Sequence, residues 1–333
     1  MDSKLERVIF ADPESNNWNF ACSVYKNILE IEKQEGCLNF KMGEVRFSRF
    51  PDGECEPKMS CDSRGRHVVF IHDASKNPYQ WWVELMLVND GLRRGSAEKI
   101  TDVLPYMRWC REEKKDKPRI PIASKVMADT INLACLGSRA DRIITMDLHA
   151  SAMQGFFNIP VDVLESYDTV CEQIKQLTAI ENVVVVSPDV GSADRARAFA
   201  NRLGGGLDIA IIDKKRQDGN LVKVYKVVGE VAGKNCFMVD DILSSGGTLN
   251  AGREALLEAG ALDIWGYVTH NVGSGDYHKN LKYFKEFYTT DTFDHPDADK
   301  KGIKIISLAS IFAKAIYRAE KGQSISELFG RKR

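Results

Sequence analysis

The stretch CFMVDDILSSGGTLNAGREALLEAGA, from Cys236 to Ala261, joins an apolar run to two acids, a turn of small residues and a helical pattern. CFMV has the continuous hydrophobicity of a strand that is buried on both faces of a parallel sheet. Such a strand places Asp240 and Asp241 at its carboxyl end, where open α/β sheets bind their ligands. The stretch therefore predicts an α/β fold with a binding site at this strand end.

Short β-branched runs of the same kind recur along the whole chain. They are RVIFAD, HVVFIHD, KITDVLPY, RIITMDLH, NVVVVSPD, IAIID, NCFMVDD, IWGYVTH and IKIISL. Helical patterns lie between them, in ASKVMADTINLACLG, SADRARAFANRLGG and LNAGREALLEAGA. Alternation of this kind indicates a parallel sheet that is covered by helices on both faces.

The order strand, acid, loop, helix occurs twice, at RIITMDLHASAMQG and at NCFMVDDILSSGGTLNAG. A chain of 333 residues also fits two domains of roughly 100–200 residues each. We predict two α/β domains, each a mainly parallel sheet flanked by helices, over residues 1–162 and 163–306, with 307–325 as a candidate to rejoin the first. Two charged tracts, 110–122 and 213–225, are predicted to be loops.

Composition excludes several other classes of protein. Lys and Arg number 46 against 47 Asp and Glu, so the charge does not favour nucleic-acid binding. No apolar run is long enough to cross a bilayer, and the first thirty residues lack the apolar core of a signal peptide. The eight cysteines lack CxxC or metal-finger spacing, which is typical of reduced thiols. We therefore predict a cytoplasmic protein that binds neither nucleic acid nor membrane.

The turn after the two acids has the composition of a phosphate cradle. Small residues let backbone N–H groups approach an anion, and the start of a helix adds partial positive charge. A P-loop is excluded because the pattern GxxxxGK is absent. Paired carboxylates beside such a cradle suit the hydroxyl groups of a sugar phosphate, or Mg²⁺.

The same stretch resembles the phosphoribosyl pyrophosphate motif of type I phosphoribosyltransferases and of ribose-phosphate pyrophosphokinases. The family form has Asp-Thr where this chain has Ser244 and Ser245. Four further segments resemble the pyrophosphokinases and follow that family's order: FSRFPDGE (47–54), KKDKPRIPIASK (114–125), TMDLHASAMQGFFNIPVDVL (145–164) and VVVSPDVGSADRARAFANRL (184–203). On these segments the sequence is identified as a member of the ribose-phosphate pyrophosphokinase family, with two type I phosphoribosyltransferase-like domains.

The resemblance implies an enzyme, a ribose-phosphate diphosphokinase. Such an enzyme moves the β,γ-diphosphoryl group of MgATP onto the anomeric hydroxyl of ribose 5-phosphate and releases AMP. Because the nucleophile belongs to the substrate, the protein has to supply alignment and positive charge. The resemblance assigns ribose 5-phosphate to Asp240, Asp241, Ser244, Ser245, Gly246, Gly247 and Thr248, with the acids on the ribose hydroxyls and the turn around the phosphate.

Catalytic and metal-binding roles also follow from the resemblance. Lys214 and Arg216 match the family's mobile catalytic loop, where two cations can stabilise charge on the diphosphoryl oxygens. His149 matches the residue that contacts Mg²⁺ and the ATP phosphates, and Asp189 matches a second magnesium ligand. Mg²⁺ is therefore the predicted cofactor.

Two segments are assigned to ATP by the resemblance. The residues are Phe50, Asp52 and Glu54 around adenine, and Arg111, Lys115 and Asp116 in the ATP loop. Arg108 is an alternative to Arg111, because Glu112 and Glu113 replace the family's Gln-Asp pair in this tract.

The resemblance further implies self-association. In the family the loop matched by residues 47–54 reaches the active site of a neighbouring subunit, so a homo-oligomer is expected, either a dimer or a hexamer. Arg64 and Arg119 match positions that take part in activation by phosphate and inhibition by ADP at a subunit interface.

Two other functions compete with this interpretation. A non-catalytic regulatory homologue would keep the fold but lose the cradle, the cation pair or the histidine, and all of these are present. Ser244 and the altered tract 108–113 are the best support for it. An ordinary phosphoribosyltransferase would not need the segments 145–164 and 184–203. The enzyme is therefore the preferred hypothesis.

Overall fold

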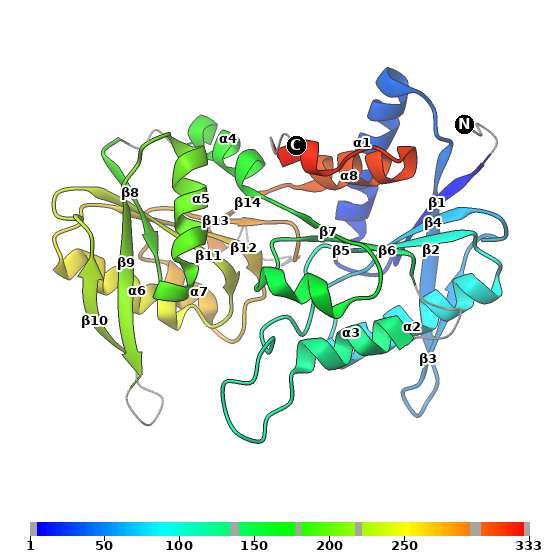
Figure 1. Ribbon diagram of the computed structural model, residues 1–333, viewed down its shortest axis with the longest axis horizontal. Helices are drawn as coiled ribbons and strands as arrows, with labels where there is room; N and C mark the ends of the chain where they lie inside the picture. Colours follow the sequence, from blue (N-terminus) through cyan, green and yellow to red (C-terminus); the bar gives the residue numbers. More distant parts are fainter. Residues whose placement is uncertain (1–4, 134–139, 178–180, 217–221, 294–300, 330–333) are drawn as a thin grey trace. The chain divides into compact units, whose positions relative to one another are not determined.

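The computed structural model describes residues 5–133, 140–177, 181–216, 222–293 and 301–329. The chain divides into two compact units. The first comprises Met1–Glu165, Thr292–Asp294 and Leu308–Arg333, and the second Ser166–Asp291 and His295–Ser307. Each unit has a seven-stranded, mostly parallel sheet with helices on its faces, which confirms the predicted α/β fold (Figure 1). Among the described residues, no helix combines the length and the apolar character needed to cross a membrane.

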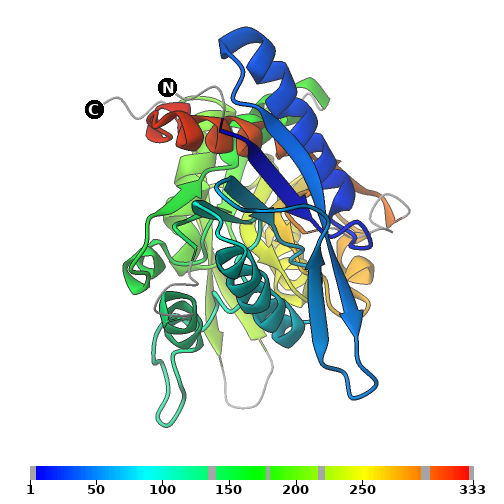
Figure 2. The same cartoon turned by 90° about the vertical axis from the view of Figure 1, so that its right-hand side faces the viewer.

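The sheet of the first unit has the strand order β3-β2-β1-β4-β5-β6-β7. Its strands are β1 (Arg7–Ala11), β2 (Phe40–Arg49), β3 (Cys55–Met59), β4 (His67–Ile71), β5 (Lys99–Leu104), β6 (Arg142–Met146) and β7 (Val161–Leu164). All neighbours are parallel except β2 and β3, which form an antiparallel hairpin that projects from the unit (Figure 2). Helices α1 (Trp18–Glu35) and α8 (Ala309–Lys321) cover one face, and α2 (Pro78–Arg94) and α3 (Ala123–Leu133) cover the other (Figure 1). Short 3₁₀ helices span Ser151–Phe156 and Ser326–Phe329.

The second unit repeats this topology, with the order β10-β9-β8-β11-β12-β13-β14. Its strands are β8 (Val183–Ser187), β9 (Ile209–Arg216), β10 (Val222–Val228), β11 (Asn235–Leu243), β12 (Ile264–Asn271), β13 (Phe287–Thr290) and β14 (Ile303–Ile306). Its helices are α4 (Tyr167–Leu177), α5 (Ala193–Leu203), α6 (Gly247–Glu258), α7 (Tyr277–Leu281) and the 3₁₀ helix η2 (Val190–Ser192). In both sheets the strand order reverses beside the first strand, between β1 and β4 and between β8 and β11. Ligands of open α/β sheets bind at such switch points.

Strand β11 shows why the run CFMV is continuously apolar. Cys236 and Met238 belong to the buried cluster that includes Leu249 of α6. Between them in the chain, Phe237 turns to the other face and stacks on Phe199 of α5, with ring centroids 5.4 Å apart. Because both faces are covered, every residue of the run is buried, as in other parallel sheets.

The nine segments predicted as strands all form strands, but one predicted loop was partly wrong. In the tract 213–225, β9 continues to Arg216 and β10 begins at Val222, and these two residues pair in an antiparallel register. The sequence VKVYKVV begins with the two-residue period of a strand, and its pairing register with β9 shifts between Val224 and Lys226. The charge of the tract concealed this period. The predicted helix in 123–137 starts at Ala123, and its residues 134–137 lie outside the described part of the chain.

A buried carboxyl group on β5 makes the stability of the first unit depend on pH. Asp102 is fully buried, and its Oδ2 accepts a hydrogen bond of 2.9 Å from Nδ2 of Asn89 on α2. Its other oxygen has no hydrogen-bond partner within the described residues. Burial raises the pKa of Asp102 to about 7, although the hydrogen bond from Asn89 opposes this shift. The folded protein therefore holds this proton at a pH where the unfolded chain has lost it.

Substitution of Asp102 by asparagine, which has no proton to lose, tests this inference. Since the pKa is raised on folding from 3.8 to about 7, wild-type stability falls as pH rises through that window. We expect Asp102→Asn to gain unfolding free energy relative to wild type between about pH 4 and pH 8, by up to about 4 kcal/mol. Chemical denaturation of both proteins across this range measures the difference. A difference that stays constant with pH would contradict the inference.

Candidate active site

In the second unit, the residues predicted for the site lie at or near the carboxyl ends of neighbouring strands. Asp189 comes after β8, Lys214 and Arg216 are among the last residues of β9, and Asp240 and Asp241 lie near the end of β11. Since β8, β9 and β11 are parallel, these positions share one edge of the sheet, beside its switch point. The side chains of Lys214 and Arg216 lie outside the part of the chain that the structure describes.

The two acids of β11 are held by an arginine. Nη2 of Arg195 lies 3.0 Å from Oδ2 of Asp241, and Nη1 lies 3.4 Å from Oδ1 of Asp240. The backbone N–H of Asp241 also donates to Oδ1 of Asp240, at 2.9 Å. Asp241 is buried and Asp240 is half-buried. Burial raises the pKa of Asp240, the neighbouring carboxylate of Asp241 raises it further, and the charge of Arg195 opposes both.

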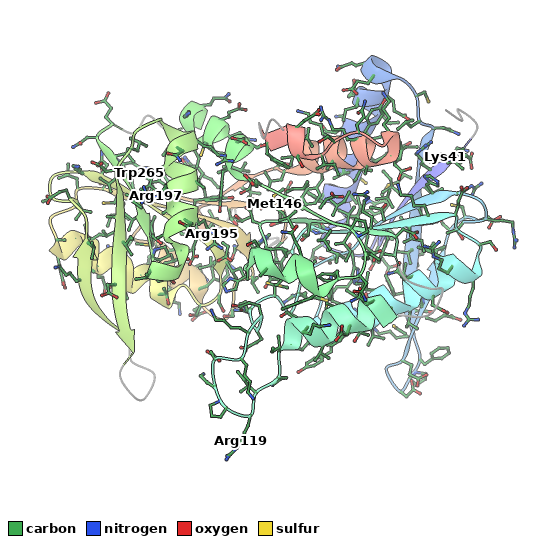
Figure 3. The ribbon with its side chains drawn as sticks, in the orientation of Figure 1. Lys41, Arg119, Met146, Arg195, Arg197 and Trp265 are labelled. Atoms are coloured by element: carbon green, nitrogen blue, oxygen red, sulfur yellow. The ribbon has the colours of Figure 1, made fainter. Side chains whose placement is uncertain are left out.

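Sequence reasoning did not single out Arg195, although a signal was present. It is the third residue of α5, within the first turn (Figure 3). A helix N-terminus carries partial positive charge and disfavours cations there. An arginine at this position therefore indicates a nearby carboxylate, and in the fold that carboxylate is the acidic pair.

The turn after β11 presents an uncapped helix N-terminus. Gly246 adopts φ 76°, in the left-handed region, and α6 begins at Gly247 without a side-chain cap. A Cβ at Gly246 would also lie 3.1 Å from Cβ of Asn280, so glycine is required for both conformation and space. Ser245, Gly247 and Thr248 are exposed. The N–H of Gly247 donates to Oγ of Ser245 at 3.5 Å within this exposed turn. An anion can reach these N–H and hydroxyl groups, as the predicted phosphate cradle requires.

Neighbouring segments brace this turn. Nδ2 of Asn280 in α7 donates to the carbonyl of Ser245 at 2.8 Å. The N–H of Ser274 donates to the carbonyl of Ser244 at 3.0 Å, and the two serine hydroxyls lie 3.3 Å apart. Ser244, at the position of the family aspartate, thus contributes to the shape of the turn. Asn280 and Ser274 were not predicted, because their contacts join segments about thirty residues apart in sequence.

Asp189 shapes the loop after β8. Its Oδ1 accepts a 2.9 Å hydrogen bond from the N–H of Ser192 and so caps the short helix η2. The hydroxyl of Ser187 donates to the carbonyl of Asp189 at 2.7 Å. The carboxyl group is half-buried at the edge of the sheet that also carries the acidic pair.

In the first unit, the segment of His149 also lies at the carboxyl edge of the sheet. Asp147, directly after β6, adopts φ 37°, which is rare for a residue other than glycine. His149 is exposed two residues later, and Leu148 between them is buried. Backbone conformations of this kind are found most often at functional sites, where surrounding structure maintains them.

The segment 47–54 forms the end of the β2–β3 hairpin. Phe50 and Glu54 close the turn through an N–H to carbonyl bond of 2.8 Å, and Gly53 at φ 96° donates to the carbonyl of Phe50 at 2.9 Å. Oδ1 of Asp52 accepts from the N–H of Glu54 at 3.1 Å. The side chains of Phe50, Asp52 and Glu54 are all exposed, so the hairpin presents them outward.

Comparison with known proteins decides the family. A family model described as the N-terminal domain of ribose phosphate pyrophosphokinase matches residues 15–134, and a phosphoribosyl transferase domain model matches residues 164–296. The ribose-phosphate pyrophosphokinase of Rhizobium meliloti (strain 1021) is 40% identical over 296 residues, which cover 88% of this chain and 94% of the relative. That of Caldanaerobacter subterraneus subsp. tengcongensis is 40% identical over 295 residues, covering 88% and 92%. The chain belongs to the ribose-phosphate pyrophosphokinase family.

A solved structure agrees with this membership. Phosphoribosylpyrophosphate synthetase from Mycobacterium smegmatis matches with a TM-score of 0.80 at 30% identity, covering 95% of this chain and 99% of that one. The family predicted from the sequence is thereby confirmed, and with it the prediction that the chain is an enzyme, a ribose-phosphate diphosphokinase. These relatives give the regulatory alternative no support.

For this pyrophosphokinase, the structure distinguishes the two candidate arginines of the ATP loop. Arg108 is buried, and its Nε and Nη2 donate to the carbonyls of Ala74 and Lys76 at 2.8 and 2.9 Å. Arg108 therefore binds backbone carbonyls of the first unit, whereas the side chain of Arg111 is exposed to solvent.

Arg111 borders a cavity of about 360 Å³ within the first unit. The cavity is lined by Pro78, Tyr79, Tyr106, Arg108, Trp109, Arg111 and Glu112. The ring of Trp109 meets those of Tyr79 and Trp82 edge to face, with centroids 5.4 and 5.3 Å apart. Aromatic surfaces beside a guanidinium group suit a planar, anionic ligand such as a nucleotide.

The remaining predicted residues of the first unit lie on exposed loops. Lys115, Asp116 and Arg119 are exposed in the tract 110–122, and Arg119, at φ 65°, points outward from the tip of that loop (Figure 3). Arg64 is exposed before β4, and its Nη1 donates to the hydroxyl of Ser96 at 3.4 Å. Neither arginine is among the residues that line the cavity.

Proposed function

We propose that this pyrophosphokinase transfers the β,γ-diphosphoryl group of ATP to O1 of ribose 5-phosphate. O1 forms a bond to the β-phosphorus, the bond from that phosphorus to the oxygen shared with the α-phosphorus breaks, and the O1 proton is released. The products are 5-phosphoribosyl 1-diphosphate and AMP. The observation that carries the proposal is the pairing of an arginine-held acidic pair with an uncapped helix N-terminus at the switch point of the second unit.

This arrangement suits ribose 5-phosphate in two parts. The carboxylates of Asp240 and Asp241 accept hydrogen bonds from the ribose hydroxyls, while Arg195 keeps the pair in one orientation. The first N–H groups of α6 and the nearby hydroxyls donate to the 5-phosphate. The residues of this cradle are Ser244, Ser245, Gly246, Gly247 and Thr248.

Charge on the transferring group has to be neutralised by cations. We assign this role to Lys214 and Arg216, whose backbone lies at the end of β9. No group of three or more His, Cys, Asp or Glu side chains forms a metal site in the described chain. Mg²⁺ takes one or two protein ligands and otherwise binds mainly to substrate phosphates and water. We assign His149 and Asp189 as such ligands; when bound, Mg²⁺ would add positive charge at the phosphates.

Nucleotide binding is assigned to the first unit. We place the ATP loop residues Arg111, Lys115 and Asp116 on the nucleotide, since Arg111 borders the aromatic cavity. Phe50, Asp52 and Glu54 are assigned to adenine. The cysteines within the described residues are free thiols, which suits a reducing compartment, and a cytoplasmic location is part of the proposal.

The reaction is tested by ³¹P NMR of the purified chain with ribose 5-phosphate, ATP and Mg²⁺. Formation of AMP together with a diphosphate ester on ribose is expected. Parallel runs with added inorganic phosphate and with ADP test the regulatory roles of Arg64 and Arg119, which should be lost in alanine variants of both. No turnover under any condition, with both substrates bound, would contradict the proposed reaction.

We further propose a homo-oligomer, a dimer or a hexamer, in which the hairpin tip serves the active site of a neighbouring subunit. Mixing two impaired variants, Asp52→Ala and Lys214→Ala, under subunit exchange should then raise activity above that of either variant alone. If subunits assort at random, about a quarter of the sites combine two intact parts. The measurement is AMP formation before and after mixing. Activity that stays at the level of the separate variants would mean that both residues serve one site in the same subunit.

A further inference from the structure

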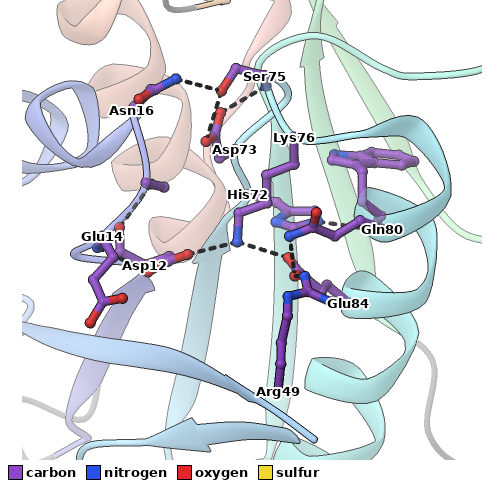
Figure 4. A network of polar contacts seen from close by, with 12 residues as sticks. Asp12, Glu14, Asn16, Arg49, His72, Asp73, Ser75, Lys76, Gln80 and Glu84 are labelled. Carbon is purple, nitrogen blue, oxygen red and sulfur yellow. Dashed lines mark hydrogen bonds and ion pairs between the residues drawn. The ribbon is translucent and has the colours of Figure 1, made fainter. Parts of the chain in front are cut away.

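A cluster of buried charges occupies the switch point of the first unit. Nζ of Lys76 lies 2.6 Å from Oδ2 of Asp12 and 2.8 Å from Oε2 of Glu84 (Figure 4). Asp12 follows β1, Lys76 follows β4, and Glu84 projects from α2. Glu84 is completely buried. The charges of this cluster are paired with one another at the place where an open α/β sheet ordinarily binds its ligand.

The second unit has different residues at the equivalent switch point. There the equivalent position, between β8 and β11, carries Asp189 and the acidic pair that we assign to substrate. In the first unit, the ammonium group of Lys76 lies between two carboxylates instead. The fold therefore repeats, but the first unit uses its switch point for an internal contact.

That contact extends to the β2–β3 hairpin. Nη2 of Arg49, the last residue of β2, lies 3.1 Å from Oε1 of Glu84, and its Nη1 donates to the carbonyl of Gly53 at 3.3 Å. Nζ of Lys76 lies 4.0 Å from the centre of the Phe47 ring. Arg49 thus joins the tip of the hairpin to a buried carboxylate of α2.

The buried carboxylate of Glu84 is stabilised by three hydrogen-bond donors. Lys76 binds one oxygen, while Arg49 and Nε2 of Gln80, at 2.7 Å, bind the other. A buried carboxylate with three charged or polar donors has a well-defined orientation. A two-stranded hairpin has little core of its own, so contacts at its base determine its direction.

The turn between β4 and α2, which contains Lys76, also contacts the loop beside the aromatic cavity. The carbonyl of Lys76 accepts a hydrogen bond of 2.9 Å from Arg108, which lines that cavity together with Arg111. The imidazole of His72, also after β4, lies 2.9 Å from the carbonyl of Trp81 in α2. Both segments that we assign to the nucleotide are therefore attached to one turn and one helix.

We propose that Glu84 and Arg49 are positioning residues for nucleotide binding, which fix the direction in which the hairpin presents Phe50, Asp52 and Glu54. This inference rests on the proposed function, which assigns that hairpin tip to adenine. Neither residue touches the reacting atoms. Their loss is therefore expected to affect the affinity for ATP and to leave the sugar-phosphate site unchanged.

Arg49→Met is the main test, because Arg49 is half-exposed and its loss is compatible with folding. We expect the KM for ATP to rise by about tenfold or more, with kcat and the KM for ribose 5-phosphate within about twofold of wild type. Arg49→Lys, which keeps the charge without the forked guanidinium, should give an intermediate KM for ATP. The matched control is Arg46→Met, on the same strand with exposed partners Glu44 and Glu14, which should change neither KM by more than about twofold.

A second pair of variants separates this inference from the function on which it rests. Glu84→Gln, if soluble and folded by circular dichroism, should reproduce the ATP-specific effect. Asp52→Ala, at the tip, should raise the KM for ATP without any change in hairpin direction. If Asp52→Ala raises this KM and Arg49→Met does not, the positioning role is overturned. If Asp52→Ala has no effect on it, the assignment of the hairpin to adenine fails, and the inference fails with it.

Discussion

Replacement of Lys214 by alanine is expected to lower kcat by about 10²–10³-fold while the KM for ribose 5-phosphate changes by less than about threefold. The nucleophile and the leaving group both belong to the substrates, so the protein accelerates transfer by placing positive charge where negative charge develops. Lys214 lies near the end of β9, opposite Val224 of β10 and at the sheet edge that carries Asp189. A charge that acts in the transition state affects turnover more than binding.

The adjacent Lys215 gives the matched control, because Lys215→Ala removes the same charge from the same strand. Steady-state kinetics with each substrate varied in turn would measure both variants. We expect Lys215→Ala to stay within about threefold of wild type in kcat, since the catalytic pair that we propose is Lys214 and Arg216. Similar losses in the two lysine variants would show a general effect of charge. Parallel losses in kcat and in ribose 5-phosphate affinity would assign Lys214 to substrate binding.

The elements that could be predicted are those whose hydrophobic period is local. CFMV and the other buried runs are continuous because helices cover both faces of their strands, and all nine form strands. Strand β10 and the β2–β3 hairpin were missed because charged residues interrupt their apolar ones, and β7 and β13 were missed because each has only four residues. Their pairing partners determine that structure, and pairing is a property of the folded chain.

In the candidate site, too, local motifs could be predicted from the sequence and long-range contacts could not. The acidic pair, the glycine turn and the segment 47–54 that we assign to adenine are short motifs, and their positions at strand ends and at a hairpin tip follow from the fold. Arg195, Asn280 and the contact of Arg49 with Glu84 join residues that are distant in sequence, with no period to reveal them. The resemblance supplied candidate ligands, and the structure supplies the residues that orient them.

The second large effect is expected at the opposite edge of the first sheet. Glu320 of α8 is buried, and its carboxylate meets the first residues of three adjacent strands. Oε2 lies 3.0 Å from Nε of Arg7 and 2.6 Å from Nδ1 of His67, and Oε1 lies 2.9 Å from Nζ of Lys99. These contacts attach the C-terminal helix to the amino ends of β1, β4 and β5.

We expect Glu320→Gln to lower the unfolding free energy by about 3–5 kcal/mol near neutral pH, because it leaves one buried and two half-buried cationic or polar groups without their carboxylate. Burial by itself would raise the pKa of Glu320, but the hydrogen bond from His67 and the charge of Lys99 outweigh it and hold the pKa at about 2. A lowered pKa means that the stabilisation is fully present above the ordinary value of 4.5 and is lost as pH falls through about 2. The difference between variant and wild type should therefore shrink with acidification below about pH 4.5.

Glu327→Gln is the control for this experiment, since Glu327 forms an exposed ion pair with Arg318 at 3.2 Å in the same C-terminal segment. Exposed pairs contribute about 0–1 kcal/mol, so this variant should unfold almost as wild type does. Denaturant titration at neutral pH, followed by fluorescence, compares the three proteins. Equal stability of the two variants would show that the Glu320 contacts contribute no more than a surface pair. A large loss confined to Glu320→Gln would show that one carboxylate joins α8 to the first strand of the sheet, β1.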